Sequence, residues 1–388
     1  MKILHIITRL ILGGAQQNTV LTCASQVGAG HNVCLVHGPI YGPEGSLLED
    51  AVGSGAQVIC VPSLRRAVLP LHDAWCYGAL RALIRKTRPD VVHTHSSKAG
   101  ILGRAAAWRE KVPAVVHTVH GLPFHDRQSF VERGLYVAAE RWAAQRCHRI
   151  IGVTHAMCGA FTDNRIGRPQ QFDMVPSGVD LGFFEQSTDD RNETRSTYGL
   201  APDATVVGIT ARLDRFKGHD DLIDVLPRLV EYRPDLHLLF VGDGYHRRQL
   251  EARIGKGPLS RRVVFTGMVP LAQVPALYRA MDVLILPSYQ EGQPRTLVEA
   301  LLCGCPIIGY DIGGIGEICI DGKTGRLVSV GDKSALAEAI MWMLDHPHER
   351  RQLVEGGQEH VRCHFSLASM VCKLEQIYTD ALENQLIR

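Results

Sequence analysis

The densest group of residues able to do chemistry is the stretch EGQPRTLVEA, which begins at Glu291 in a loop rich in glycine and proline. Pro294 suits the first position of a helix, because the amide that proline lacks has no partner there in any case. Three amides then lie at the positive end of that helix: those of Thr296, Leu297 and Val298. Backbone amides at a helix start bind phosphate groups, so the stretch predicts a diphosphate site.

Two carboxylates frame this helix start. Glu291 precedes it and lies within reach of hydroxyl groups on whatever the phosphate carries. Glu299 lies more than a turn into the helix, where a carboxylate can accept from two adjacent hydroxyls such as those of a ribose. Contacts for phosphate, ribose and sugar within one short stretch outline a site for a nucleotide sugar.

A pair of cations follows an expected strand over Thr205–Ala211. Arg212 stands at the end of this strand and Lys217 comes five residues later, so both cations can converge on one anion. The planar guanidinium and the compact ammonium suit a diphosphate leaving group. A charged surface loop would also explain these two residues, but the presence of Glu291 and Glu299 favours the diphosphate.

Glycine loops after three other strands allow close backbone approach. Gly13 and Gly14 follow the first strand and expose amides at the next helix start. Gly242 lies in the sequence VGDG, where a base or ribose can approach, and Val269 lies in FTGMVP, where backbone groups can meet a base edge. Each segment also works as an ordinary turn, so none identifies a ligand alone.

Histidines alternate on two neighbouring strands, with His93 and His95 on one and His117 and His120 on the next. A metal site would need a further ligand on the same face, and the sequence shows no convincing one. An Asp-x-Asp site for a nucleotide-bound metal is also missing, so we expect no metal and no cofactor. His120 stands at the carboxyl end of its strand, where parallel sheets bind ligands. We therefore expect His120 to be the histidine of the site and the others to be structural or partly exposed.

Basic and aromatic residues gather between positions 65 and 88, among them Arg65, Arg66, Arg81 and Trp75. Such a patch can contact the headgroups of an anionic membrane. The solvated face of a helix is the simpler explanation and the preferred one. The net charge of +2 over 388 residues gives no reason to expect nucleic acid as a partner.

The composition is that of a globular protein, with 45% apolar and 21% charged residues. Eleven cysteines without paired spacing indicate reduced thiols and a cytoplasmic protein. The apolar start of the chain is better explained by a buried first strand than by a signal peptide. No apolar run approaches the roughly 18 residues that a membrane helix needs.

Short apolar runs alternate with helical patterns along both halves of the chain, which is typical of parallel βαβ units. The first half predicts strands over Lys2–Thr8, Asn32–His37, Gln57–Pro62, Val91–His95, Ala114–His120 and Arg149–Thr154. The second half predicts strands over Thr205–Ala211, His237–Gly242, Val263–Gly267, Asp282–Pro287, Pro306–Tyr310 and Gly325–Val330. The expected fold class is therefore α/β, with two doubly wound, Rossmann-like domains.

The two domains are expected over residues 1–185 and 186–365, joined by a polar linker over residues 186–194, with a helical segment over 366–388. Neither half carries G-x-G-x-x-G after its first strand, which argues against a dehydrogenase. Ligands of open parallel sheets bind beyond the carboxyl ends of the strands, so two facing domains would form a cleft. The last segment is long enough to cross back to the first domain.

Together these residues resemble glycosyltransferase family 4, a large family of retaining enzymes with the GT-B fold. The matching pieces follow the family's order over nearly the whole chain: Gly13-Gly14, His120-Gly121, the hinge VPSGVD at 175–180, Arg212 with Lys217, VGDG at 241–244, and Glu291 with Glu299. Ser177 stands where the family commonly has asparagine, and both residues are small and polar, so we expect the hinge to persist. The stretch HTHSSKAG at 93–100 is similar to members that build lipid-linked or capsular glycans.

The resemblance implies a role for each matching position. Arg212 and Lys217 would hold the diphosphate, Glu299 would hold the ribose, and Gly14 would approach the phosphate from the first domain. The implied nucleotide-sugar site comprises Gly13, Gly14, Arg212, Lys217, Gly242, Val269, Glu291, Gly292, Gln293, Pro294, Arg295, Thr296, Leu297, Val298 and Glu299.

The resemblance also implies which residues face the sugar. Glu291, with the amides between Gly292 and Arg295, would hold the hydroxyls of the donor sugar. His120 would line the sugar and acceptor side, and Arg295 would help to select the sugar. The implied catalytic group is His120, Arg212, Lys217 and Glu291.

The predicted activity is transfer of a hexose or N-acetylhexosamine from a nucleotide diphosphate sugar to a hydroxyl of a glycan or lipid-linked acceptor, with retention by front-face attack. Uridine is the preferred base and guanosine the alternative. A nucleotide-sugar epimerase, a sugar-phosphate synthase and a non-catalytic scaffold that binds sugar nucleotides stay open as other functions. The sequence leaves open the sugar, the acceptor, whether the protein is a monomer or a dimer, and how strongly it contacts an anionic membrane.

Overall fold

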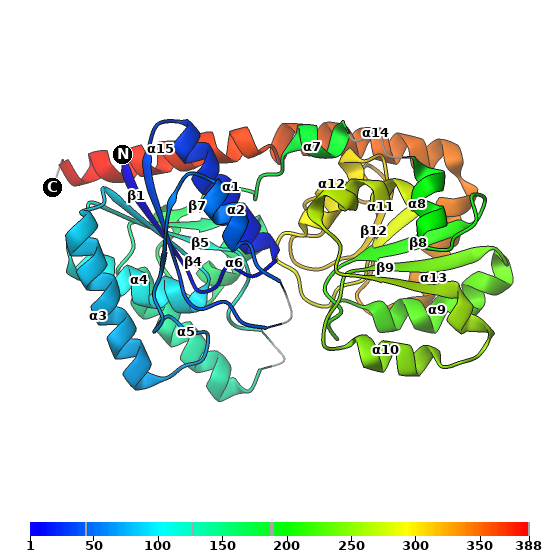
Figure 1. The fold of residues 1–388 in the computed structure, drawn as a ribbon, viewed down its shortest axis with the longest axis horizontal. Coiled ribbons are helices and arrows are strands. Elements are labelled where there is room, and N and C mark those ends of the chain that lie inside the picture. The colour runs from blue at the N-terminus through cyan, green and yellow to red at the C-terminus, as the bar shows by residue number, and fades with distance from the viewer. Residues whose placement is uncertain (43–44, 126–127, 187–189, 387–388) are drawn as a thin grey trace. The chain divides into compact units, whose positions relative to one another are not determined.

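The computed structural model describes residues 1–388 apart from positions 43–44, 126–127, 187–189 and 387–388 (Figure 1). The chain forms two compact units. The first unit comprises Met1–Gly178 together with Leu367–Arg388, and the second comprises Val179–Ser366. Each unit is built on its own parallel sheet, which confirms the doubly wound α/β fold class predicted from the alternating sequence pattern.

The first unit contains a seven-stranded sheet in the order β3-β2-β1-β4-β5-β6-β7. Its strands are β1 (Lys2–Ile7), β2 (Asn32–His37), β3 (Gln57–Cys60), β4 (Val91–His95), β5 (Ala114–Val119), β6 (Arg149–Gly152) and β7 (Phe172–Met174). The first six agree with the predicted strands to within two residues. The sequence did not predict β7, because three residues are too few for a periodic pattern.

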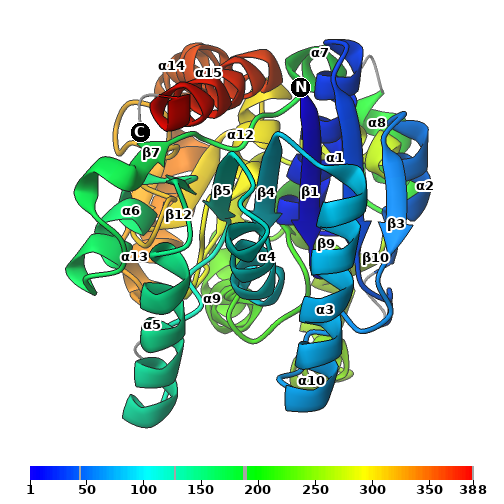
Figure 2. The ribbon, with the colours of Figure 1, turned by 90° about the vertical axis from the view of Figure 1, so that its left-hand side faces the viewer.

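Helices cover both faces of this sheet. They are α1 (Gly14–Gly28), α2 (Leu48–Gly53), α3 (Pro70–Thr87), α4 (Ser97–Arg109), α5 (Phe130–Ala144), α6 (His155–Asp163) and α15 (Leu367–Leu386). On one face α4 packs between α3 and α5 and lies against β1, β4 and β5 (Figure 2). The side chains of β1 alternate between the two faces of the sheet. Leu4 and Ile6 pack with α3 and α4, whereas Ile3 and Ile7 point to the opposite face.

The C-terminal helix α15 belongs to the first unit although it follows the second unit in sequence. Met370, Leu374 and Tyr378 are buried in one cluster with Ile3 of β1 and Val116 of β5. The prediction that this segment crosses back to the first domain is therefore confirmed. Burial of this apolar stripe, at about 25 cal/mol per Å² of apolar surface, stabilises the helix on the sheet.

The second unit contains a six-stranded parallel sheet in the order β10-β9-β8-β11-β12-β13. Its strands are β8 (Thr205–Thr210), β9 (Leu236–Val241), β10 (Val263–Gly267), β11 (Val283–Leu286), β12 (Ile307–Tyr310) and β13 (Arg326–Val328). Its helices are α7 (Leu181–Glu185), α8 (Arg191–Thr197), α9 (His219–Tyr232), α10 (Arg247–Ile254), α11 (Val274–Ala280), α12 (Arg295–Leu302), α13 (Lys333–Asp345) and α14 (Pro347–His364). Each strand overlaps one of the six that the sequence predicted for this half.

The division between the units lies at Gly178 and Val179, a few residues before the expected boundary at 185–186. The stretch 186–194, expected to be a linker, instead enters the second unit, although its residues 187–189 lie outside the described residues. Asp190 caps α8 by accepting a hydrogen bond of 2.7 Å from the amide of Asn192. Its polar composition suggested a linker, but Arg191 is held by an ion pair with Asp282 and Asp190 caps the helix.

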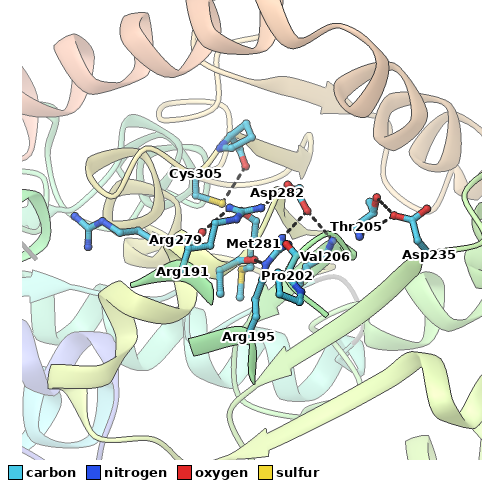
Figure 3. A network of polar contacts seen from close by, with 12 residues as sticks. Arg191, Arg195, Pro202, Thr205, Val206, Asp235, Arg279, Met281, Asp282 and Cys305 are labelled. Carbon is cyan, nitrogen blue, oxygen red and sulfur yellow. Dashed lines mark hydrogen bonds and ion pairs between the residues drawn. The ribbon is translucent and has the colours of Figure 1, made fainter. Parts of the chain in front are cut away.

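A partly buried acid, Asp282, anchors α8 to the sheet of the second unit (Figure 3). Asp282 lies just before β11 and accepts hydrogen bonds from Arg191 at 2.6 Å and from Arg195 at 2.9 Å. It also accepts one from the backbone amide of Val206 at 2.8 Å. The Arg195 side chain is 2% exposed and also donates to the carbonyl of Pro202 at 2.6 Å. One carboxylate thus joins a helix, the start of β8 and the start of β11.

Replacing Asp282 with alanine is expected to lower the free energy of unfolding of the second unit by about 3–5 kcal/mol, because Arg195 would stay buried without its partner. The measurement is urea unfolding of the full chain followed by circular dichroism. Glu338→Ala is the matched control, since its ion pair with Arg228 is exposed on both sides and should contribute less than about 1 kcal/mol. Equal losses for the two variants would contradict this assignment.

Candidate active site

The predicted cations and the first predicted acid of the second half, Glu291, lie in the loops after the carboxyl ends of β8 and β11, which are adjacent in the sheet. Arg212 follows β8 by two residues, and Glu291 follows β11 by five. The two loops touch, because the amide of Tyr289 donates to the carbonyl of Phe216 at 2.8 Å. Open parallel sheets bind ligands at this edge, so the topology places the predicted residues where a ligand can meet them.

Lys217 and Glu291 form an ion pair across these loops. Glu291 also accepts a hydrogen bond of 3.0 Å from the hydroxyl of Ser288. The side chains of Lys217 and Glu291 are 22% and 10% exposed, so the pair is largely shielded from water but can still be reached. Sequence reasoning missed Ser288, whose only signal was its place directly after the strand β11 and Pro287.

Asp214 organises the loop that carries Arg212. Its carboxylate accepts from the hydroxyl of Tyr245 at 2.6 Å, from the amide of Phe216 at 3.2 Å and from Arg212 at 3.4 Å. Burial alone would raise the pKa of Asp214, but these hydrogen bonds and the nearby cations lower it below its usual value. The acid therefore stays ionised and holds Arg212, which is half exposed, at the strand end.

Two glycines permit the close approach of these loops. Gly218 has φ +74, and a Cβ atom there would lie 1.9 Å from the carbonyl oxygen of Pro287. Gly242 has φ +125, and its Cβ would lie 2.4 Å from the carbonyl oxygen of Ala211. Both positions need glycine to close the backbone of the unit. The structure thus gives the predicted Gly242 a backbone role.

The helix after Glu291 begins one residue later than predicted. Pro294 is the N-cap of α12, and Arg295 is its first residue. The prediction of a free amide at Leu297 is also wrong, because this N–H donates a hydrogen bond to the carbonyl of Pro294 at 3.2 Å. The amides that open the helix are therefore those of Arg295 and Thr296, where an α-helix has no carbonyl to offer them.

A glycine-rich loop packs against the same segment. The amide of Gly314 donates to the carbonyl of Gly292 at 2.9 Å. Gly313 has φ +55, and a Cβ atom there would lie 2.4 Å from the carbonyl oxygen of Glu291. The loop after β12 therefore fixes the backbone of Glu291 and Gly292 at the start of α12.

Glu299 lies in the interior of α12, where it is 6% exposed. It accepts from the hydroxyl of Tyr278 at 3.0 Å, and its other oxygen lies 3.6 Å from Nε of Arg295. Burial raises the pKa of Glu299, while the charge of Arg295 and the hydrogen bond from Tyr278 oppose that rise. Arg295, expected to help select a sugar, is itself 6% exposed and turned onto Glu299. Sequence reasoning missed Tyr278, which carries no local signal.

The remaining predicted contact of this unit, Val269, follows the edge strand β10 and packs partly buried against the core. In the first unit Gly13 is the N-cap of α1, which begins at Gly14. The carbonyl of Gly13 accepts from the amide of Gln17 at 2.9 Å. This glycine pair thus lies at a helix start beyond the carboxyl end of β1, as predicted.

His120 follows β5 directly, at the carboxyl end of its strand as predicted. Its Nε2 atom lies 3.1 Å from Nδ1 of His95, which is fully buried. The structure also brings His5 of β1 to His93 and His95, so that one ligand atom from each lies within 4.8 Å of the others. The sequence search for a third histidine missed His5, although a histidine inside an apolar strand was a signal.

Two family models match this chain. The model described as glycosyl transferases group 1 matches residues 190–360, and that described as Glycosyltransferase Family 4 matches residues 12–183. A D-inositol 3-phosphate glycosyltransferase of Actinosynnema mirum is 31% identical over 308 residues, covering 74% of this chain and 72% of that one. The UDP-Gal:alpha-D-GlcNAc-diphosphoundecaprenol alpha-1,3-galactosyltransferase of Escherichia coli is 28% identical over 352 residues, covering 88% of each chain.

Solved structures share the fold. Anabaena HepE in complex with UDP and glucose superposes with a TM-score of 0.84 at 21% identity, covering 98% of this chain and 99% of that one. WaaG, a glycosyltransferase involved in lipopolysaccharide biosynthesis, gives a TM-score of 0.76 at 19% identity, covering 97% and 99%. The architecture is that of the GT-B glycosyltransferases. The chain belongs to glycosyltransferase family 4, joined to a group 1 domain, and is a glycosyltransferase.

Proposed function

We propose that this glycosyltransferase moves a hexose or N-acetylhexosamine from a UDP-sugar to a hydroxyl of a glycan or lipid-linked acceptor, with retention of the anomeric configuration. The observation that carries the proposal is the Lys217–Glu291 ion pair beside Arg212 and the start of α12. One cation and one acid are thereby held together at the edge of a parallel sheet. This is what a ligand with a diphosphate on one side and sugar hydroxyls on the other requires.

Donor binding would exchange the partners of this pair. The ammonium of Lys217 would turn from the carboxylate of Glu291 to a phosphate oxygen, and Glu291 would then accept from a sugar hydroxyl. Arg212 and the amides of Arg295 and Thr296 would add positive charge around the same diphosphate. Charge that develops on the departing diphosphate would be stabilised by groups already in place, which is the largest single contribution in many enzymes.

The proposed step requires no metal and no enzyme nucleophile. The acceptor hydroxyl would attack the anomeric carbon from the face that the diphosphate leaves, and a phosphate oxygen would take the proton of that hydroxyl. The bond from the anomeric carbon to the diphosphate breaks as the bond to the acceptor oxygen forms. His120 would line the sugar and acceptor side, and Glu299 would accept from the ribose. We place this chemistry in the cytoplasm.

The relatives support the choice of substrates. The name of the Escherichia coli enzyme gives UDP-Gal as its donor and a diphosphoundecaprenol glycan as its acceptor, and HepE was crystallised with UDP. The test is incubation with UDP-galactose, UDP-glucose and UDP-N-acetylglucosamine, each with GlcNAc-diphosphoundecaprenol. The anomeric coupling constant of the product should match that of the donor. An inverted product, or a 2-epimer or sugar phosphate formed instead of a glycoside, would contradict the proposal.

We further propose that the first unit touches an anionic membrane through the starts of α3 and α5, which both reach beyond the strands (Figure 2). Exposed apolar side chains cluster at these starts: Val68, Leu71 and Trp75 near one, and Phe130, Val131 and Leu135 near the other, each at least 65% exposed. No helix in the described part of the chain is both long enough and apolar enough to cross a bilayer. A lipid-linked acceptor would therefore be reached from the surface of its membrane.

Changing Phe130 and Leu135 together to serine should weaken binding to phosphatidylglycerol vesicles by about tenfold or more, because each side chain contributes roughly 1.5–3 kcal/mol when buried in lipid. Vesicle flotation measures this. Met268 and Val330, exposed apolar residues of the second unit, supply the control when both are changed to serine. Unchanged vesicle binding of the Phe130 and Leu135 variant would contradict the proposal that this surface contacts the membrane.

A further inference from the structure

A layer of polar side chains lies inside the first unit on the face of the sheet covered by α1 and α15. His5 of β1 is in register with His93 of β4, and His95 is in register with Thr118 of β5. All four side chains are buried. Gln26 of α1 and Tyr378 of α15 reach into the layer from the covering helices. The glycosyl transfer proposed above assigns no role to any of these six residues.

One chain of hydrogen bonds runs from Gln26 to His120. Oε1 of Gln26 lies 2.8 Å from Nε2 of His5, and Nδ1 of His5 lies 3.0 Å from Nε2 of His95. Nδ1 of His95 lies 3.1 Å from Nε2 of His120. Two imidazoles in series, those of His5 and His95, thus connect a buried amide to His120 at the carboxyl end of β5.

A second chain leaves the same amide in the other direction. Nε2 of Gln26 donates to the hydroxyl oxygen of Tyr378 at 3.4 Å, and that hydroxyl lies 2.5 Å from Nδ1 of His93. Nε2 of His93 lies 2.7 Å from Oγ1 of Thr118. Tyr378 has one proton to give, and accepting from Gln26 leaves that proton for His93. The two chains therefore share the orientation of one amide.

The three buried imidazoles of His5, His93 and His95 are neutral. Burial lowers the pKa of His5 to about 4, although the hydrogen bond that His5 donates to Oε1 of Gln26 opposes this shift. Burial and the neighbouring histidines lower the pKa of His93 and His95 well below the usual range. A neutral imidazole has one N–H donor and one acceptor nitrogen. If one nitrogen of a ring accepts a hydrogen bond, the other must donate one, so all hydrogen bonds in a chain of such rings run in the same direction.

We propose that this buried relay fixes the tautomer of His120. Oε1 of Gln26 accepts from His5, Nδ1 of His5 accepts from His95, and Nδ1 of His95 accepts from Nε2–H of His120. His120 then carries its proton on Nε2 and presents Nδ1 as an acceptor. Turning the amide of Gln26 over would reverse every bond and move the proton of His120 to Nδ1.

The relay makes Gln26, His5, His95 and Tyr378 positioning residues for His120. An Nδ1 acceptor receives a hydrogen bond from a substrate hydroxyl, whereas an Nδ1–H group would have to donate one. The tautomer thereby sets which polar group of a bound sugar or acceptor His120 can meet. This consequence rests on the proposed function, while the tautomer itself does not.

A metal ion held by His5, His93 and His95 is the competing explanation. Each of these rings is already used in hydrogen bonds at both nitrogens, and His5 and His95 bond directly to one another. A tetrahedral zinc would need three nitrogens at about 2.0–2.1 Å from one centre, which would break those bonds. The observed distances favour the relay.

The test uses ¹⁵N-histidine-labelled full-length protein near neutral pH, without substrate. The ¹⁵N shifts and couplings of each ring distinguish Nε2–H from Nδ1–H, and the His120→Gln spectrum identifies the His120 signals. We expect a single Nε2–H tautomer. Nδ1–H as the main form, or zinc-induced shifts of His5, His93 and His95 at equimolar metal, would overturn the proposal.

A matched pair of variants separates the relay from packing. His95→Asn keeps an acceptor near the position of Nδ1, whereas His95→Leu has nearly the same size and no acceptor. His120 should stay in one tautomer in the Asn variant and become a mixture in the Leu variant, with kcat about tenfold lower in Leu than in Asn, as expected for one lost hydrogen bond. The same tautomer in both variants would overturn the relay.

Tyr378→Phe provides a second test of the relay, because it removes only a hydroxyl and leaves the packing nearly intact. Without the hydroxyl, the amide of Gln26 is no longer coupled to His93 and can adopt either orientation, so His120 should show both tautomers. Tyr310→Phe, which removes a buried hydroxyl bonded to Asp221 in the second unit, should leave His120 unchanged. Equal spectra for the two variants would contradict the relay. A correct tautomer in a protein without transferase activity would instead contradict only the proposed function.

Discussion

Replacing Lys217 with alanine should lower kcat by about 10²–10³-fold, the range found when one charge-stabilising donor is removed from a transition state. The ammonium is positioned before substrate arrives, because Glu291 holds it at the edge of the sheet. Its charge would act most strongly when negative charge grows on the leaving diphosphate, so kcat should fall more than KM rises. Initial rates of UDP release at saturating donor measure the effect.

Arg228→Ala supplies the control for this variant. Arg228 is also a cation paired with an acid in the second unit, here Glu338 of α13, and both side chains are exposed. Its loss should leave kcat within about twofold, as expected for an exposed ion pair. A Lys217→Ala enzyme with near-normal turnover and an intact fold would contradict the proposal that Lys217 binds the diphosphate.

Replacing Glu299 with alanine should have two separate effects. The nucleotide should bind about 10- to 100-fold more weakly, because charged hydrogen bonds to a ribose contribute roughly 1.5–3 kcal/mol. The free energy of unfolding should also fall by about 3–5 kcal/mol, since Arg295 would remain buried with its charge uncompensated. Calorimetric titration with UDP and urea unfolding measure the two effects independently.

The double variant Glu299→Ala with Arg295→Met distinguishes these effects. Removing both charges eliminates the uncompensated cation, so stability should recover most of its loss. Nucleotide affinity should stay low, because the acceptor for the ribose is still missing. If affinity recovers together with stability, Glu299 acts only by holding Arg295 and α12 in place, and its contact with the ribose is contradicted.

The fold was predictable because its strands are apolar runs separated by helical patterns. All six strands expected in each half exist, and the residues chosen for chemistry lie where parallel sheets bind ligands. Arg212 and Glu291 illustrate why this works, since each follows a strand closely enough for the chain itself to fix its place. Three-residue β7 and the short helix α8 escaped prediction because neither is long enough to show a period.

The contacts within the site were less predictable, because they depend on which strands become neighbours. Nothing local in the sequence pairs Lys217 with Glu291 or brings Tyr278 to Glu299. The partners of His5 also come from other elements, β4 and α1, so its place in the site could not be predicted. Pro294 was misplaced by one residue because a proline fits both the N-cap and the first helical position.

The most direct test of the central claim is calorimetric titration of the full chain with UDP and with GDP, each with and without EDTA. We expect UDP to bind more tightly than GDP, EDTA to leave the Kd of UDP unchanged, and Lys217→Ala to weaken the binding of UDP. Binding of UDP that EDTA abolishes, or no binding of either nucleotide, would contradict a metal-independent diphosphate site built from Arg212, Lys217 and the start of α12.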